Sequence, residues 1–209
     1  MTSVPMTLVI GSKRFSSWSL RPWLTLKRAG ADFQEVEIPL RQADTKSQIL
    51  KWSPSGKVPC LIHGQVKIWD SLAICEYVAE LFPKAALWPQ GAEARAVARS
   101  VSAEMHSGFA VLRQRCPMDV CIRTPLADPP TELLVEVERV KTIWNECRHR
   151  FGQGGPFLFG RFSVADAMFA PVVTRFTTYA LKLDQVSKAY CEAVWAMPAM
   201  QEWKQTACA

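Results

Sequence analysis

The chain has 209 residues, 49% of them hydrophobic, so it is long enough to bury a core as one domain or as two small ones. Its 25 Lys and Arg residues are dispersed among 19 Asp and Glu residues without a basic block, which argues against a nucleic-acid partner. No apolar run approaches the roughly 20 residues that cross a bilayer, and residues 1–5 lack a basic region followed by an apolar one, so we expect no membrane partner and a cytoplasmic location.

The seven cysteines are scattered, odd in number and mostly set among apolar residues. This pattern predicts reduced packing thiols instead of a disulfide framework. No Cys-x-x-Cys pair occurs, and the spacing of Cys116, Cys121, Cys147 and His149 fits no common zinc module. We therefore expect no metal site.

Three serines stand where a buried strand is expected to pass into an amphipathic helix. Residues 7–10 form a short apolar run, and residues 20–26 carry apolar side chains at helical spacing before a stop at Gly30. Ser16, Ser17 and Ser19 therefore fall at a helix start, where free N–H groups and the helix dipole stabilise an anion. Capping statistics alone favour an N-cap role for these serines over a catalytic one.

The next segments predict the rest of a small sheet. Residues 32–40 form a second strand, which the strand–helix–strand order places parallel to residues 7–10. Residues 44–52 are weakly helical, and residues 58–62 and 66–69 predict an antiparallel hairpin. Pro59 needs an edge position or a special turn, which a cis bond after Val58 provides; the Val58 main chain is then free for an extended ligand.

A polar pair and a proline bound the following helix. Asp70 is a natural N-cap for residues 72–82, and Pro83 ends the helix. Asp70 and Ser71 are either simple caps or ligand contacts. Residues 84–90 read as a linker, so we predict one domain over residues 1–83 and an all-helical one over residues 91–209.

The second half is helical throughout. We predict one long helix over residues 92–115, an irregular break over 117–130, and a second long helix over 131–151 with Leu134 and Val137 on its buried side. After the glycine-rich residues 152–155, Ser163 and Asp166 resemble a capping box. The helix that follows contains Pro171, which indicates a kink or a later start, and short helices are expected over 188–196 and 198–206.

Together these segments resemble the cytosolic glutathione S-transferase family over nearly the whole chain, through three motifs in the right order and a fourth, serine-rich one. Three are the loop before a cis-proline, an acidic-Ser pair and a C-terminal capping motif, here Gly56-Lys57-Val58-Pro59, Asp70-Ser71 and Gly160-x-x-Ser163-x-Ala165-Asp166. The fourth, Ser16-Ser17-Trp18-Ser19 with Arg21, is similar to the Ser-Ser-Cys-Ser motif of the zeta class, with Trp18 in place of cysteine. That departure makes isomerisation of the maleylacetoacetate type subordinate to a transferase activity.

The resemblance implies a fold of class α/β plus all-α: a thioredoxin-like domain with a mixed four-stranded sheet, then a helical bundle. It further implies a homodimer, glutathione as co-substrate, and detoxification by transfer to a small hydrophobic electrophile. A non-catalytic ligand-binding or regulatory protein that keeps this fold is the alternative.

The resemblance also assigns site residues. Ser16, with Ser17 as its competitor, would stabilise the glutathione thiolate, because the free thiol has a pKa of about 8.5. Asp70 and Ser71 would hold the γ-glutamyl end. The remaining glutathione contacts would be Val58 and Pro59 for the cysteinyl backbone and Lys57, with Lys46, for the glycyl carboxylate. The electrophile pocket would draw on Trp18, Met105, His106, Phe109 and Arg113, although apolar members of such a stripe are more often core.

Overall fold

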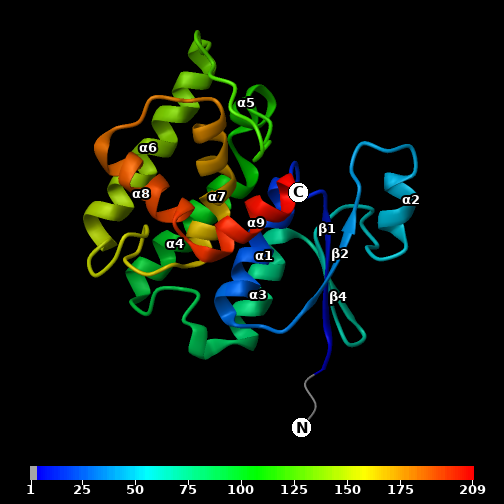
Figure 1. The fold of residues 1–209 in the computed structure, drawn as a ribbon. Coiled ribbons are helices and arrows are strands. Elements are labelled where there is room, and N and C mark those ends of the chain that lie inside the picture. The colour runs from blue at the N-terminus through cyan, green and yellow to red at the C-terminus, as the bar shows by residue number, and fades with distance from the viewer. Residues whose placement is uncertain (1–3) are drawn as a thin grey trace.

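The computed structural model describes residues 4–209 and divides them between a sheet and a helical body (Figure 1). Strand β1 (Met6–Gly11) pairs in parallel with β2 (Gln34–Ile38) and antiparallel with β3 (Cys60–His63), which pairs antiparallel with β4 (Val66–Ile68). The described residues thus contain a mixed four-stranded sheet in the order β2-β1-β3-β4. This confirms the predicted fold class, the parallel pair and the hairpin.

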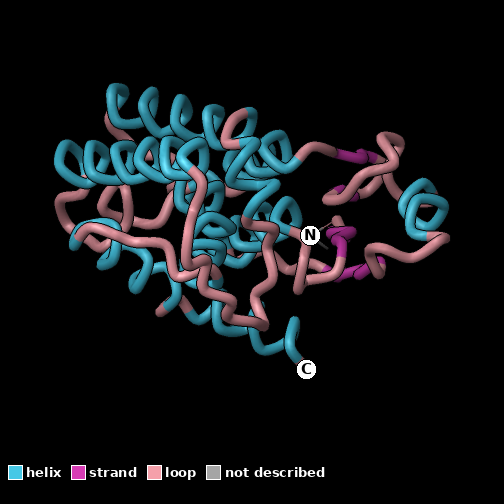
Figure 2. The backbone as a smooth tube through the Cα atoms, turned by 90° about the horizontal axis from the view of Figure 1, so that it is seen from above, coloured by secondary structure: helices cyan, strands magenta, loops and turns pink. Residues whose placement is uncertain are grey.

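Successive side chains of β1 point to opposite faces of the sheet. Leu8 and Ile10 belong to the large core that also contains side chains of α1 (Ser17–Ala29) and α3 (Ser71–Leu81). Val9 faces the other way, into a small core with Ile49 of α2 (Thr45–Leu50). Figure 2 shows the strands between the helical body and α2.

Helix α1 connects the two halves of the molecule. It packs against α3 on one side and against α7 (Val164–Thr178) on the other. Leu20, Trp23 and Leu26 are fully buried in this contact. The helix ends as predicted at Gly30, whose φ of 69° lies in the left-handed region that glycine adopts without strain.

The C-terminal half is built around α7, a helix with nearly all of its side chains buried. Among residues 4–209 the other helices are α4 (Ala92–Ser107), α5 (Ala110–Arg115), α6 (Thr131–Phe151), α8 (Gln185–Trp195) and α9 (Pro198–Cys208), with a 3₁₀ turn at Pro83–Ala85. The capping box of Ser163 and Asp166 is present. Helix α7 begins directly after it, so Pro171 does not delay the helix start.

Two helical predictions are wrong. The single helix expected over residues 92–115 is broken between α4 and α5, where Gly108 is extended and Phe109 has a φ of 61°. A Cβ on Gly108 would lie 2.9 Å from the Glu104 carbonyl oxygen, so the break needs glycine. Leu134 is 43% exposed, because the buried stripe of α6 begins at its neighbour Leu133.

The cysteine prediction is wrong at one pair. Cys121 and Cys208 form a disulfide whose Cα atoms lie 5.5 Å apart, across 87 residues of chain. The last turn of α9 brings Cys208 to the irregular segment after α5, and no local spacing in the sequence predicts that contact. The remaining five cysteines are free and buried, as expected for packing thiols.

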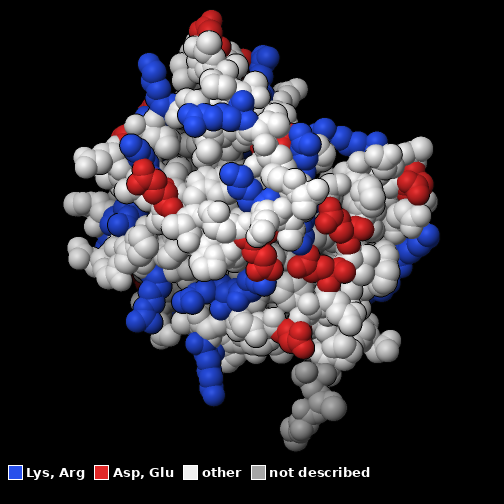
Figure 3. Space-filling view, viewed as in Figure 1, with Lys and Arg blue, Asp and Glu red and all other residues white. Residues whose placement is uncertain are grey.

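On the face shown in Figure 3, Lys and Arg side chains are interspersed with Asp and Glu. Across residues 4–209, none of the helices combines the length and apolar character that crossing a membrane requires. Within the same residues, no group of three or more His, Cys, Asp or Glu side chains could hold a metal ion.

Candidate functional site

A cleft of about 540 Å³ lies where the start of α1 meets the edge of the sheet. Its walls come from the first turn of α1, the loop before β3 and the start of α3. It brings together six of the predicted site residues, and its lining consists of Trp18, Ser55, Lys57, Val58, Pro59, Trp69, Asp70 and Ser71.

The serines lie at the helix start as predicted, but below the cleft surface. Ser16 is the N-cap of α1 and is only 4% exposed; its Oγ accepts a hydrogen bond from the Ser19 amide at 3.4 Å. The Ser16 and Ser19 hydroxyl oxygens are 2.7 Å apart, and Ser19 Oγ accepts the Gly11 amide at 3.1 Å. Ser19 can donate its own proton to the Ser16 oxygen while it accepts that amide, and the Ser16 proton is free for an anion in this arrangement.

Ser17 has a different environment from Ser16. It is 6% exposed, and within residues 4–209 its side chain has no hydrogen-bond partner. Neither Ser16 nor Ser17 belongs to the residues that line the cleft, where Trp18 lies instead. The two serines therefore differ in that Ser16 is tied into a hydrogen-bond chain and Ser17 is not.

Three contacts from distant parts of the chain hold the loop that leads to Ser16. The Lys13 carbonyl accepts the indole N–H of Trp203 at 2.9 Å, in a buried contact across 190 residues. The Arg14 carbonyl accepts the Val120 amide at 3.3 Å. The Arg14 guanidinium also forms a bidentate pair with Asp119, with distances of 2.8 to 3.0 Å. The segment after α5 and helix α9 thus fix the approach to the helix start.

Asp70 and Ser71 stand at the start of α3. Asp70 is the N-cap, and its Oδ1 accepts the Leu72 amide at 2.8 Å while the rest of the side chain stays exposed at 47%. Ser71 is buried, and its Oγ accepts a 3.5 Å hydrogen bond from Arg21 Nη1. A negative carboxylate and a helix N-terminus with a hydroxyl therefore lie side by side, a pairing that suits an ammonium group and a carboxylate on one ligand.

The loop before β3 supplies the opposite wall of the cleft. The Val58–Pro59 peptide bond is cis, as is Trp69–Asp70. Lys57 is exposed on the cleft lining, whereas Lys46 is exposed on α2 and lies outside the lining. The structure therefore brings Lys57, Val58 and Pro59 together and leaves Lys46 apart.

Two guanidinium groups lie over the Trp18 ring. Arg21 Cζ is 4.4 Å and Arg113 Cζ is 4.7 Å from the ring centroid, and the His106 ring meets it edge-on at 5.3 Å. His106 Nε2 is 3.2 Å from Asp70 Oδ2. Cation–π contacts of this kind gain strength when they are shielded from water.

The electrostatics of this cluster follow from its burial. Arg21 is fully buried with Nε and Nη2 unpaired among the described residues, and burial lowers the pKa of Arg21 to about 9, helped by the charges of Arg113 and Arg175. Burial also lowers the pKa of His106 below its ordinary value. The charges of Arg21 and Arg113 act in the same direction, while the charge of Asp70 opposes them. The lowered pKa favours the neutral form of His106 at pH 7.

The predicted electrophile stripe divides between this cluster and the core. His106 and Arg113 lie against Trp18, but Met105 is fully buried and Phe109 is 7% exposed, both within the large core. Arg113 reaches Trp18 by folding back over the end of α4, where it donates to the carbonyls of Met105 and Gly108. The break at Gly108 and Phe109 makes that return possible.

Sequence reasoning missed the roles of Ser19 and Arg21. Both are fully buried behind the cleft, Ser19 in contact with Ser16 and Arg21 in contact with Ser71 and Trp18. One signal was available, because an arginine and a serine on the inner side of an otherwise apolar helix are costly to bury without a polar task.

Comparisons with known proteins agree with this geometry. The family model "Glutathione S-transferase, N-terminal domain" matches residues 15–81, and "Glutathione S-transferase, C-terminal domain" matches residues 95–203. The chain also shares its fold with a solved glutathione transferase homolog from Burkholderia gl BGR1 with bound glutathione, at a TM-score of 0.72 and 24% identity over 97% of each chain.

Curated relatives are similar over shorter stretches. Glutathione S-transferase 1 of Dianthus caryophyllus is 40% identical over 82 residues, which is 39% of this chain and 36% of that protein. A probable maleylacetoacetate isomerase of Caenorhabditis elegans is 37% identical over 94 residues, 44% of this chain and 42% of that protein. The chain therefore spans about two fifths of the length of each of these relatives.

Proposed function

The chain belongs to the glutathione S-transferase family, and on that premise we propose that it binds glutathione in the 540 Å³ cleft and transfers its thiolate to a small hydrophobic electrophile. The observation that carries the proposal is the convergence on one cleft of the start of α1, the loop of Val58 before β3, and the Asp70–Ser71 pair, with the Ser16 and Ser17 hydroxyls just below the lining. These three parts match the thiol, the backbone and the charged end of a γ-glutamyl tripeptide.

The glutathione thiol must lose its proton to become a strong nucleophile. The dipole of α1 and a donated hydroxyl proton favour the anion at the helix start. Ser16 is the first candidate donor, because the Ser19 hydroxyl, which accepts the Gly11 amide, can donate its proton to the Ser16 oxygen and leave the Ser16 proton for the sulfur. Ser17 remains the competitor, since its hydroxyl is uncommitted. The thiolate then attacks the electrophilic carbon, a sulfur–carbon bond forms, and the leaving group takes the displaced electron pair.

The remaining contacts follow from charge and shape. Asp70 would pair with the γ-glutamyl ammonium group, and the Ser71 hydroxyl with the N-terminus of α3 would receive its carboxylate. The Val58 main chain would pair with the cysteinyl backbone as an added strand rung. Lys57 would neutralise the glycyl carboxylate. The electrophile would lie against Trp18, bordered by His106 and Arg113.

A second candidate is glutathione-dependent isomerisation of an acidic substrate. The Arg113 and Arg21 guanidinium groups beside Trp18 favour an electrophile that carries a carboxylate, and one curated relative is named a probable maleylacetoacetate isomerase. Trp18 stands where the zeta-class motif has cysteine, which keeps this candidate second.

The test combines binding with turnover. The protein is applied to glutathione resin and assayed with a panel of aryl halides, enoates, peroxides and maleylacetoacetate, alongside Ser16→Ala and Ser17→Ala. We expect retention on the resin, conjugation of at least one apolar electrophile, and a large fall in kcat with a nearly unchanged glutathione KM for Ser16→Ala. An inactive Ser17→Ala beside a fully active Ser16→Ala would move the role by one residue.

A protein that binds no glutathione and turns over nothing in the panel would instead be the non-catalytic ligand-binding or regulatory alternative. We also propose a cytoplasmic homodimer with a role in detoxification, as the family resemblance implies. Light scattering on the purified protein tests the dimer, and fractionation of the native cells tests the location.

A further inference from the structure

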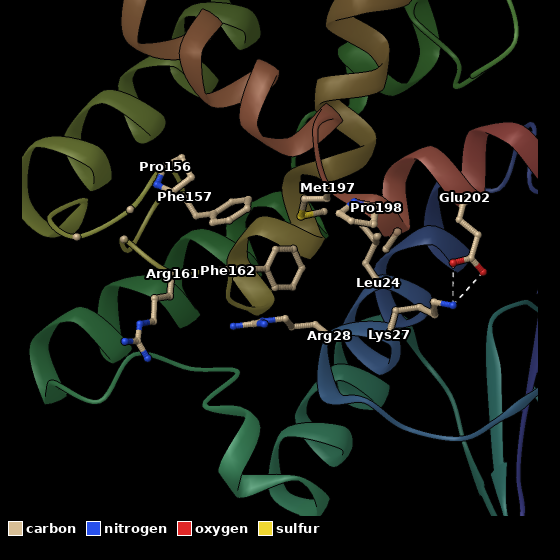
Figure 4. Close-up of a pocket in the computed structure, with 14 residues that line it drawn as sticks. Leu24, Lys27, Arg28, Pro156, Phe157, Arg161, Phe162, Met197, Pro198 and Glu202 are labelled. Carbon is tan, nitrogen blue, oxygen red and sulfur yellow. Dashed lines mark hydrogen bonds and ion pairs between the residues drawn. The ribbon is translucent and has the colours of Figure 1, made fainter.

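Helix α9 runs alongside α1 from the end of α1 to the loop before its start. At the end of α1, Leu24 and Lys27 border the same pocket as Met197 and Glu202 at the beginning of α9 (Figure 4). Lys27 Nζ is 2.8 Å from Glu202 Oε2, an ion pair that Figure 4 shows between the two helices. This end of α9 is thus held by packing and by charge.

Trp203 anchors the middle of α9. Its side chain is fully buried, its ring meets the Trp23 ring edge-on at 5.1 Å, and its indole N–H donates to the Lys13 carbonyl at 2.9 Å. Beyond Trp203, residues 204–208 are exposed except for the half-buried Ala207. The last turn of α9 therefore buries little surface of its own, and the disulfide of Cys208 is what ties it to the rest of the molecule.

The other half of the disulfide lies next to a contact that holds the loop before Ser16. The Asp119 carboxylate accepts the Cys121 amide at 3.1 Å, and the same carboxylate accepts both hydrogen bonds of the bidentate pair with Arg14. The covalent bond at Cys121 therefore restrains Asp119, and Asp119 restrains the loop through Arg14. Opening the disulfide would loosen this segment and the last turn of α9 together.

The two halves of the disulfide differ in their access to solvent. Cys208 is exposed and Cys121 is half-buried, whereas the five free cysteines are buried. Exposed disulfides are the ones that thiols reduce most readily, and disulfides in cytoplasmic proteins, the location proposed above, are usually transient or redox-sensing. Thiol attack from solvent is therefore favoured at Cys208 over Cys121.

The surface near the disulfide carries positive charge without a partner. Arg123 follows Cys121 by two residues, and Lys204 precedes Cys208 by one helical turn on the same face of α9. Neither cation pairs with a carboxylate within residues 4–209. Lys204 Nζ is 5.5 Å from the Trp195 ring centroid, and Trp195 and Arg123 line one cavity, so both cations belong to one surface. Glutathione has two carboxylates and one ammonium group, and its net negative charge favours approach to such a surface.

We propose that glutathione, attracted by Arg123 and Lys204, opens the Cys121–Cys208 disulfide by thiol–disulfide exchange, with Cys208 as the site of the mixed disulfide, and thereby loosens the loop before Ser16. This exchange rests on the proposed function for one reactant only, the glutathione thiol. It does not need glutathione to occupy the cleft beside α1.

The exchange has two steps. In the first, a glutathione thiolate attacks Cys208 Sγ, a sulfur–sulfur bond forms between them, and Cys121 leaves as a thiolate that takes a proton from water. In the second, another glutathione thiolate attacks the sulfur of the bound glutathione, Cys208 leaves as a thiolate, and glutathione disulfide is released. Two electrons thus pass from two glutathione thiols to the protein, and glutathione disulfide reverses both steps.

Mass spectrometry locates the adduct. The protein is incubated with mixtures of glutathione and glutathione disulfide, quenched in acid and alkylated before digestion. We expect a glutathione adduct on the Cys208 peptide, an alkylated Cys121, and no adduct on the buried Cys147. Cys121→Ser, which lacks the thiol that displaces the adduct, should accumulate it in glutathione disulfide. A disulfide that stays closed in glutathione, or an adduct on Cys121 alone, would overturn the proposal.

Charge removal tests the attraction of glutathione to this surface. Arg123→Gln/Lys204→Gln should slow exchange with glutathione about threefold relative to exchange with 2-mercaptoethanol, a neutral thiol, and the difference should shrink at high salt. Arg150→Gln is the matched control, because Arg150 is an exposed arginine that pairs with Glu93. It should keep the wild-type ratio of the two rates. The same ratio in the double variant would contradict recognition of glutathione by the two cations.

Hydrogen exchange reads the structural consequence without turnover. After opening by glutathione, amides of residues 12–17 and 204–208 should exchange faster, while those of α6 should not change. In Cys121→Ser/Cys208→Ser the same amides should exchange fast with or without glutathione. Unchanged exchange over residues 12–17 in the opened wild type would overturn the link to Ser16. A protein without transferase activity can still show the adduct, and an active transferase with an inert disulfide would overturn this proposal alone.

Discussion

The hydroxyl oxygens of Ser16 and Ser19 lie 2.7 Å apart at the start of α1, and Ser19 also accepts the Gly11 amide of β1. The strand therefore fixes the position of the Ser19 hydroxyl, and Ser19 in turn fixes the position of the Ser16 hydroxyl oxygen. This arrangement gives Ser16 an orientation that an ordinary N-cap serine does not need.

Ser19→Ala should lower kcat without a large change in glutathione KM, because Ser16 loses the hydroxyl that fixes the position of its oxygen. The change also leaves the buried Gly11 amide unpaired, which should lower the free energy of unfolding by about 1–3 kcal/mol. Ser102→Ala is the control, since it removes another buried serine hydroxyl, bonded to the Ala98 carbonyl at 2.7 Å in α4. Steady-state kinetics and urea unfolding measure both effects; wild-type kcat in Ser19→Ala contradicts the positioning role.

Lys57 and Lys46 offer a matched pair of charge removals. Lys57 lies on the cleft lining and Lys46 does not. Lys57→Gln should therefore raise the glutathione KM about three- to tenfold by loss of one charge-assisted contact to the glycyl carboxylate, and the increase should shrink at high salt. Lys46→Gln should keep the wild-type KM. Equal KM values for the two variants would remove Lys57 from the proposed site.

The sequence alone was enough to predict the elements that are marked by local patterns. Hydrophobic spacing predicted α1 and α6 closely, Gly30 predicted a helix end, and Ser163 with Asp166 predicted the start of α7. The sequence also singled out Val58, Asp70 and Ser71, which line one cleft in the structure, because each belongs to a short motif next to a turn or a helix start.

Features that depend on tertiary contact were not predictable. Phe109, whose left-handed backbone separates α4 from α5, is a residue type that does not usually mark the end of a helix. The Cys121–Cys208 disulfide joins two segments that are 87 residues apart, and no sequence motif predicts the pairing. The surroundings of Arg21 depend on the return of Arg113 to the Trp18 ring, which no local pattern predicts. These contacts were missed because each joins elements far apart in the sequence.

Trp18 contacts two positive charges, and its removal should affect stability and specificity together. Trp18→Ala should lower the free energy of unfolding by about 1–3 kcal/mol through loss of two cation–π contacts. It should also raise kcat/KM for bulky electrophiles relative to small ones. Trp18→Phe keeps an aromatic face and should show a smaller effect on both quantities. An unchanged free energy of unfolding in Trp18→Ala would show that the contacts of Arg21 and Arg113 with the Trp18 ring do not stabilise the protein.

His106 should make the folded protein less stable as the pH falls. Its pKa in the folded protein is lowered, chiefly by burial and further by Arg21 and Arg113, with Asp70 acting against them. The unfolded chain then takes up the proton near the ordinary value of about 6.5 while the folded chain resists it, so stability present above that pH is lost as the pH falls through it. The difference in urea midpoint between pH 7.5 and pH 5.5 should be smaller in His106→Asn. His63→Asn, which alters another half-buried histidine, is the control.

The Cys121–Cys208 disulfide joins the two segments that hold the loop before Ser16. Asp119 and Val120 contact Arg14 just before Cys121, and Trp203 contacts Lys13 one turn and a half before Cys208. Cys121→Ser/Cys208→Ser should lower the free energy of unfolding by about 2–4 kcal/mol, because the unfolded chain regains the freedom of a long loop. It should also lower kcat by loosening the helix start. A thiol reductant should have these effects on the wild type and none on the double variant, and equal sensitivity of the two proteins to the reductant would rule out the disulfide as the cause.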